Sequence, residues 1–397
     1  MVTFLASLLW WQVPAPLPVA ARAVTLEEAL AKADALPDLQ AAMAALRAAE
    51  AGVRLAGRPG DPTVAFSRRS ITAHESFTLS LPLPWPGRGA RVSAATAEAV
   101  AVGADLDAAK NLARRAMRLL WFGLAAREDL ASAAADRAGR LNGVADAVKE
   151  LHDAGRVSLL ELSRARADAA LAAADTVQAS EEARTAEAGL RRWMALPSTE
   201  RVTVARPLPP FEAEGPIETA LETAAARSPL ARSAEARFKA AEARLRLASA
   251  LRFPGVAVEA GADRNDPTQP GTDKSIGVSL TVPLGAGPGI AIAKAERDGA
   301  RALLDSAKRE ALDATETAWR AAHAARARYQ AIETEALPSA IQAAELTQIA
   351  YREGRSDIFR LLDAERALAE ARSALAEAYL AWGTARAGLL SIIGEER

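Results

Sequence analysis

The side chains that could support catalysis or metal binding are few in this chain and lie far apart in the sequence. There is no cysteine, which excludes disulfides, thiolate metal sites and thiol nucleophiles. His74, His152 and His323 fall in an expected external loop, before a helical turn and within a helix, whereas a metal site needs converging ligands. The glycine-rich run at 285–289 lacks the lysine and the spacing of a phosphate-binding loop. We therefore expect no enzyme activity, no metal and no cofactor.

Two charge reversals are the other chemical feature of the sequence. The segments GRVSLLELSRARADAAL and GRSDIFRLLDAERALAE lie 199 residues apart, inside segments that are Ala-rich and lack proline. At this offset Glu161 corresponds to Arg360, and Arg164 corresponds to Asp363. Such positions could form ion pairs with one another, or they could lie on an ordinary solvated helix face.

The charges belong to a duplication of almost the whole chain. SFTLSLPLP from Ser76 matches SIGVSLTVP at the same offset, and AAEAGVRLA matches AAEARLRLA at an offset of 192. A repeat of this length is not a solenoid unit. Each half predicts a helix, a β-hairpin and a long helical hairpin that turns at Gly155 or Gly354. Pro338 and its equivalent Gly139 predict a break in the rising helix of both copies.

Composition divides the chain into a leader, two repeats and a linker. An apolar stretch from Phe4 to Trp11 and a Pro/Ala run ending at Ala23 predict a signal peptide, with a disordered N-terminus as the alternative. The predicted divisions are 1–23 for the signal peptide, 24–196 for the first repeat, 197–215 for the linker and 216–397 for the second repeat. Within the repeats we expect β-hairpins at about 62–85 and 254–284, and long helical hairpins at about 88–195 and 291–394.

Alternating apolar residues predict four short strands that cross a membrane. No segment after the leader reaches the ~18 consecutive apolar residues of a spanning helix, so insertion would use strands. Four strands cannot close a barrel and lipid excludes an open edge, so several copies of the chain must pool their strands. The change of offset from 192 to 199 predicts a longer external loop at about Asn265 to Lys274 than at Arg68 to Glu75. The expected lipid-facing residues are Val64, Phe66, Phe77, Leu79, Leu81, Val256, Val258, Ile276, Val278 and Leu280.

Several of these segments resemble the TolC family of outer-membrane efflux proteins, and the resemblance covers about Thr25 to Gly394. The stretch from Pro84 to Arg91 looks like a junction of the heavy-metal branch, with Gly-Arg-Gly where Gly-Lys-Arg is usual. Because the chain has no cysteine, we expect it to lack the lipid anchor that many members carry on an N-terminal cysteine. The segments that carry the resemblance are Gly354-Arg355-Ser356, Leu362 to Leu368, Leu337-Pro338 and Leu390 to Gly394.

The resemblance implies a mixed fold, all-α plus membrane β, in which three chains form an α-barrel and a twelve-stranded β-barrel. It implies a passive exit duct in the outer membrane, with a long periplasmic extension, that serves a tripartite efflux or secretion system for small molecules or metal ions. The implied partners are two further copies in a homotrimer, outer-membrane lipid, a periplasmic adaptor and an inner-membrane pump of the RND type. A net charge of −1 argues against a nucleic-acid groove.

In such a trimer, equivalent positions of the two repeats alternate around the periplasmic mouth, so opposite charges become neighbours. We expect ion pairs among these charges to hold the resting entrance closed. The alternative is a soluble periplasmic coiled-coil structural or adaptor protein whose strands form a small independent domain. The expected entrance gate is Glu161, Arg164, Arg360 and Asp363, and the expected adaptor contacts at the hairpin turns are Gly155, Arg156, Gly354 and Arg355.

Overall fold

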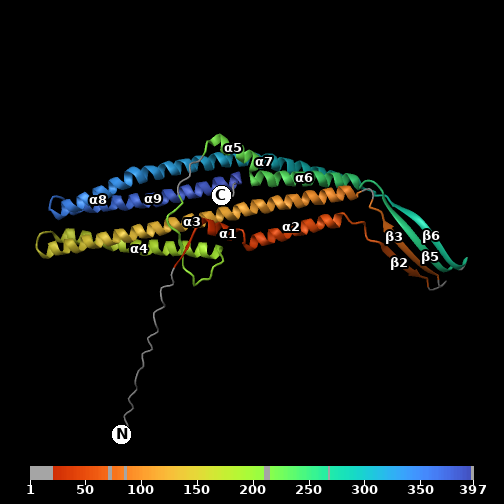
Figure 1. Ribbon diagram of the computed structural model, residues 1–397, viewed down its shortest axis with the longest axis horizontal. Coiled ribbons are helices and arrows are strands. Elements are labelled where there is room, and N and C mark those ends of the chain that lie inside the picture. Colours follow the sequence, from red (N-terminus) through yellow and green to blue (C-terminus); the bar gives the residue numbers. More distant parts are fainter. Residues whose placement is uncertain (1–20, 70–73, 85–86, 210–214, 267–268, 395–397) are drawn as a thin grey trace, which may run out of the picture. The chain divides into compact units, whose positions relative to one another are not determined.

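The computed structural model describes residues 21–69, 74–84, 87–209, 215–266 and 269–394 (Figure 1). The chain forms two compact units, one from residues up to 32, 120–211 and 329–380, the other from 33–119, 212–328 and 381 onward. Each unit therefore takes segments from both sequence repeats. The signal peptide expected at 1–23 lies almost entirely outside the described residues and stays a prediction, although strand β1 (Arg22–Val24) includes its last two residues.

The first unit is built from helices of both repeats and a two-stranded parallel sheet. The sheet pairs β1 with β4 (Val202–Val204), so the segment expected to be a linker contributes a strand. Buried apolar residues of the two helical hairpins, among them Leu141, Val148, Leu162 and Leu361, form one core. The helices that contribute to the unit are α1 (Leu26–Ala33), α3 (Arg88–Asp153), α4 (Leu159–Trp193), the π-helical turn η1 (Ile332–Ala336), α8 (Leu337–Arg352) and α9 (Ile358–Ile393).

The second unit contains the four expected strands in one antiparallel sheet with the order β2-β3-β5-β6 (Figure 1). Each repeat supplies one hairpin, and pairing of β3 with β5 joins the hairpins. Parts of α3 and α9 also belong to this unit. Its other elements are α2 (Pro37–Ala56), β2 (Thr63–Arg68), β3 (Glu75–Pro82), α5 (Ile217–Arg227), α6 (Pro229–Ala250), β5 (Gly255–Asp266), β6 (Gln269–Thr281) and α7 (Ala286–Ala331).

Both helical hairpins turn at the glycines expected from the repeat. Gly155 and Gly354 have φ of 72° and 74°, a left-handed conformation that glycine adopts at little cost and most other residues do not. After Gly155, the Arg156 N–H donates to the Leu151 carbonyl at 2.8 Å, and Arg355 donates in the same way in the second copy. This bond closes a Schellman motif, which satisfies carbonyls at the end of each rising helix.

The expected helix break is present in only one copy. The π-helical turn η1 immediately precedes Leu337-Pro338, where a proline cannot continue the regular hydrogen-bond pattern. In the first copy α3 continues through Gly139 without interruption, so the predicted break there is wrong. Glycine costs a helix only about 1 kcal/mol relative to alanine, and neighbouring packed turns such as the one at Leu141 outweigh that cost.

The extra residues of the second β-hairpin extend its strands, which corrects the expected long loop at Asn265 to Lys274. Strands β5 and β6 contain 12 and 13 residues, and β5 ends at Asp266 while β6 begins at Gln269. Strands β2 and β3 contain 6 and 8 residues. A bulge between Arg264 and Asp266, with Asn265 at φ 60°, marks the end of the regular ladder. The insertion therefore lengthens the ladder, because alternating residues continue to find partners across it.

Candidate functional site

The ten residues expected to face lipid lie on one face of the second unit's sheet. Directly opposed residues in an antiparallel sheet share a face, and Val64 pairs with Leu79, which pairs with Ala260 and then Ile276. The other cross-strand pairs of these ladders place the remaining apolar residues in rows beside this one, on the same face. Nine of the ten are exposed large hydrophobics, with Ile276 at 88%, and Val256 is half-buried. The sheet thus presents a contiguous apolar surface, the membrane-face candidate.

The opposite face of the sheet is polar. The hydroxyls of Ser67 and Ser76 lie 2.7 Å apart across the β2–β3 pair. Alternation puts Glu259 and Asp263 on the same face as these serines. Near the hairpin ends, His74 Nε2 lies 3.4 Å from Asp263 Oδ1. A four-stranded sheet with one apolar and one polar face is suited to separate lipid from water.

The two outer strands of this sheet have one neighbour each in the described part of the chain. Strand β2 pairs only with β3, and β6 pairs only with β5. A free edge presents unpaired N–H and C=O groups, which are costly to bury in an apolar medium. Closure by strands of further copies would satisfy them.

The charged residues expected at the entrance are held, in one chain, by partners within their own helices. Glu161 completes a capping box with Ser158, whose N–H donates to Glu161 Oε2 at 2.8 Å. In the second copy Asp357 replaces the serine, accepts the N–H of Arg360 at 2.8 Å and lies 3.8 Å from its guanidinium. The charge reversal between Glu161 and Arg360 therefore follows from two different helix caps.

The second pair of expected gate residues also finds local partners. Arg164 Nε lies 3.4 Å from Asp168 Oδ2, and Asp363 Oδ1 lies 3.8 Å from Arg366 Nη1. No two of the four gate residues form an ion pair with each other within the described chain. The side chains of Arg360 and Asp363 are each 76% exposed, so they remain accessible to a second copy.

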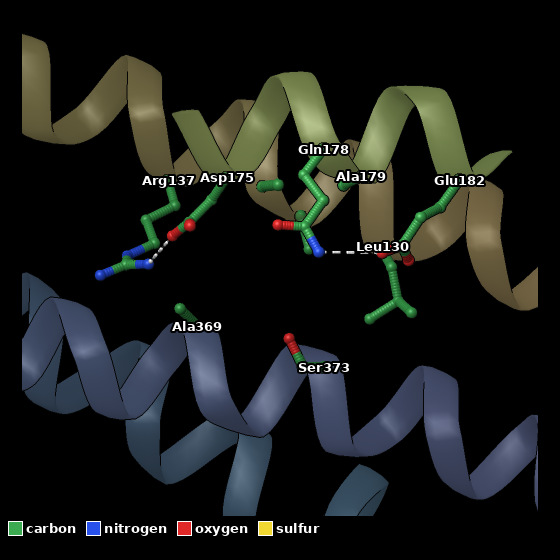
Figure 2. A pocket seen from close by; sticks show the side chains of 10 residues that line it. Leu130, Arg137, Asp175, Gln178, Ala179, Glu182, Ala369 and Ser373 are labelled. Carbon is green, nitrogen blue, oxygen red and sulfur yellow. Dashed lines mark hydrogen bonds and ion pairs between the residues drawn. The ribbon is translucent and has the colours of Figure 1, made fainter. Parts of the chain in front are cut away.

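A groove of about 260 Å³ lies among α3, α4 and α9 of the first unit (Figure 2). Arg137 Nη1 donates to Asp175 Oδ2 at 3.0 Å, which links α3 to α4, and Gln178 Nε2 donates to Glu182 Oε1 at 3.0 Å. The α9 wall is made of small side chains, including Ser373. The polar groups of the groove thus serve helix packing, and their arrangement has none of the convergence that a catalytic site requires.

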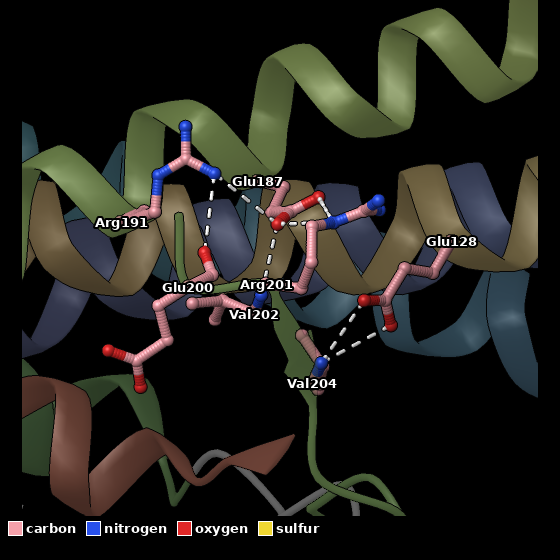
Figure 3. Close-up of polar contacts among 7 residues, drawn as sticks. All are labelled: Glu128, Glu187, Arg191, Glu200, Arg201, Val202 and Val204. Carbon is pink, nitrogen blue, oxygen red and sulfur yellow. Dashed lines mark hydrogen bonds and ion pairs between the residues drawn. The ribbon is translucent and has the colours of Figure 1, made fainter. Parts of the chain in front are cut away.

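Two carboxylates accept hydrogen bonds from the edge of strand β4 that faces away from β1 (Figure 3). Glu187 accepts the Val202 N–H at 3.0 Å and a bond from Arg201 Nε at 2.9 Å. Glu128 accepts the Val204 N–H at 3.1 Å, and burial raises the pKa of its carboxyl. These bonds block the edge of the small sheet to further strands. Three residues are too few to show a periodicity, so no sequence pattern predicts this strand.

The histidines are engaged separately. His152 Nδ1 lies 3.1 Å from the Val157 carbonyl, and His323 stacks on Trp319 with ring centroids 5.1 Å apart. Among the described residues, no group of three or more His, Asp or Glu side chains is placed to hold a metal ion. The described helices include none with the length and apolar character needed to cross a membrane.

Comparison with known proteins supports the expected fold. Residues 220–395 match the family described as "Outer membrane efflux protein". A membrane protein from Pseudomonas aeruginosa is similar over 94% of this chain and 91% of its own length, with 19% identity and a TM-score of 0.78. VceC from Vibrio cholerae, an outer membrane protein, is similar over 93% of this chain and 96% of its own length, with 20% identity and a TM-score of 0.75. The open-state MtrE outer membrane channel of Neisseria gonorrhoeae is similar over 93% of this chain and 88% of its own length, with 20% identity and a TM-score of 0.77. No match was found among curated proteins. The expected resemblance is confirmed, and so is the expected fold of the single chain, long helices with a small antiparallel sheet.

Proposed function

With residues 220–395 matching the outer membrane efflux proteins and nearly the whole chain folded like TolC-type channels, we propose that this protein is a passive outer-membrane exit duct. It would act as a homotrimer and carry solutes received from a periplasmic adaptor and an inner-membrane pump. The proposal extends to a pump of the RND type and to small molecules or metal ions as cargo. The chain supplies a path through the membrane and no chemistry of its own.

The observation that carries this proposal is the exposed apolar face of the β2-β3-β5-β6 sheet, together with its two outer strands, which each have one neighbour among the described residues. Burying apolar area stabilises by roughly 25 cal/mol per Å², so a face this apolar requires lipid or protein against it. Three sheets joined edge to edge would satisfy the strand edges and expose the apolar residues to lipid. A soluble coiled-coil adaptor gives no account of such a face.

We also propose that Arg360 and Asp363 act at the entrance, between neighbouring copies, with Glu161 and Arg164 as their counterparts. The high exposure of Arg360 and Asp363 supports this role. The hydrogen bond that Glu161 accepts from the Ser158 N–H competes with it. Exposed ion pairs contribute about 0–1 kcal/mol each, so several copies around a mouth would make a weak and reversible closure. The hairpin turns at Gly155-Arg156 and Gly354-Arg355 are the proposed adaptor contacts.

The experiment compares charge placed on the two faces of one strand. Leu79→Arg puts a cation on the proposed lipid face, and Thr78→Arg puts it on the opposite face one residue away. A cation against lipid costs about 2–4 kcal/mol near the bilayer centre, so Leu79→Arg should reduce the heat-resistant trimer in the outer-membrane fraction. Thr78→Arg should insert normally and alter single-channel conductance. Normal insertion of both variants, or recovery of the wild type as a soluble monomer, would refute the duct.

A further inference from the structure

The apolar face of the four-stranded sheet ends in basic side chains near the hairpin ends. In the β5–β6 register Lys274 is opposite Ala262, and Arg264 is opposite Thr272. Alternation therefore places both cations on the same face as Ile276. Arg264 and Lys274 are diagonal neighbours on adjacent strands, a relation that separates positions by roughly 7–8 Å and leaves long side chains able to reach one ligand.

These two cations lack the neutralising partner that the third basic residue of this region has. Arg68 Nε lies 3.7 Å from Glu75 Oε1 across the β2–β3 pair. Arg264 and Lys274 are exposed, and neither forms a side-chain ion pair within the described part of the chain. Glu75 lies directly opposite Arg264, so the two cross-strand rows that contain Arg264 and Lys274 carry three cations and one carboxylate, a net charge of +2 on this face.

The two described aspartates that adjoin Arg264 and Lys274 in the sequence do not lie on the same side as this charge. Alternation places Asp263 and Asp273, which are directly opposite each other, on the polar face. Asp263 is also the partner of His74. On the apolar face, Lys274 lies in the same cross-strand row as Phe66 and Phe77, and the next row contains Leu79 and Ile276, so the apolar surface begins directly beside the two cations.

We propose that Arg264 and Lys274 bind the phosphate of an anionic lipid whose acyl chains lie along the apolar face beside Ile276. The inference rests on the proposed function, because it requires this face to meet a bilayer. A phosphate monoester offers several strong acceptor oxygens, which suit the guanidinium and ammonium donors of these two residues. Cations beside an anionic membrane surface are attracted to it, and the extended β5–β6 ladder places Arg264 and Lys274 in adjacent cross-strand rows.

The test uses the detergent-purified trimer, native mass spectrometry and two probes with the same acyl chains, phosphatidic acid and diacylglycerol. The wild type should retain phosphatidic acid and release diacylglycerol. The Arg264→Gln/Lys274→Gln variant should bind phosphatidic acid about tenfold or more weakly, with diacylglycerol unchanged. The matched control removes two exposed cations from α7, Lys294→Gln/Arg301→Gln, and should bind as the wild type does.

Trimer content and single-channel conductance are measured on the same samples, which separates this inference from the duct itself. A conducting trimer that binds both probes equally, or a double variant that keeps its affinity for phosphatidic acid, overturns the lipid site and leaves the duct intact. Full displacement of phosphatidic acid by an equal concentration of inorganic phosphate indicates a free-anion site and also overturns it. A wild-type protein that forms no trimer and conducts no ions refutes the proposed duct.

Discussion

Arg140 Nε donates a hydrogen bond to Glu365 Oε2 at 2.7 Å, and the Glu365 side chain is only 3% exposed. The two residues come from different sequence repeats, on α3 and α9. Their pair joins the helical hairpins within the first unit, next to the apolar core that contains Leu361 and Leu362. The contact between hairpins therefore combines burial with a charge pair that is largely removed from solvent.

Breaking this pair should destabilise the protein strongly. Arg140→Ala leaves the Glu365 carboxylate buried without its cation, which costs roughly 3–5 kcal/mol for buried pairs. Arg372, which donates to Asp136 at 2.7 Å on a more exposed part of the same interface, is the matched control. Arg372→Ala should cost about 1 kcal/mol or less. Denaturant unfolding of both variants checks the difference, and equal losses would contradict the burial argument.

A role of Glu161 in the gate and a role only in the helix cap predict different effects of its substitution. Glu161→Gln keeps an acceptor for the Ser158 N–H but removes the charge, whereas Glu161→Ala loses both. If the residue serves only as a cap, Gln should leave stability and conductance close to wild type, and Ala should cost about 1 kcal/mol. If it also serves the gate, Gln should raise single-channel conductance without loss of stability.

The second-repeat charges provide the direct test of the entrance. Arg360→Ala together with Asp363→Ala removes two highly exposed side chains, so we expect little change in unfolding. The same double variant should increase conductance through the trimer, because the weak closure between copies is lost. Unchanged conductance would contradict a gate at these positions.

Two glycines should respond to alanine in opposite directions. Gly155→Ala forces a side chain into φ 72° at the hairpin turn, which should cost about 1–2 kcal/mol. Gly139→Ala lies inside the continuous α3 with nothing within 4 Å of the added Cβ, and should stabilise by up to about 1 kcal/mol. Thermal unfolding of the two variants measures both signs. Destabilisation by Gly139→Ala would mean that a break at this position is needed after all.

Glu128 should make stability depend on pH in the mildly acidic range. Burial raises the pKa of its carboxyl in the folded protein above the ordinary value of 4.5. The folded state then binds more protons than the unfolded state, so this contribution is present below the ordinary pKa and is lost as pH rises through the folded value. Glu128→Gln should flatten the difference in unfolding free energy between pH 4 and 7. An unchanged slope would contradict the assignment.

Features that depend on short-range pattern could be predicted from the amino-acid sequence alone. The alternation from Phe77 to Leu81 and from Ile276 to Leu280 placed the expected lipid-facing residues on one face, because alternate residues of a strand always share a side. Gly155 and Gly354 marked the hairpin turns, because few other residues tolerate their backbone conformation. The duplication predicted the order of elements in both halves.

Features that depend on distant partners could be recognised only in the folded chain. Strand β4 forms because β1 and the carboxylates of Glu187 and Glu128 satisfy its backbone groups, and no local pattern in three residues predicts them. Packing against neighbouring helices keeps α3 regular at Gly139, since it outweighs a local preference of about 1 kcal/mol. The insertion near Lys274 forms paired strands instead of the expected loop, because its residues find partners across the β5–β6 ladder. Local propensity is a weak term, and long-range burial and hydrogen bonding decide wherever the two disagree.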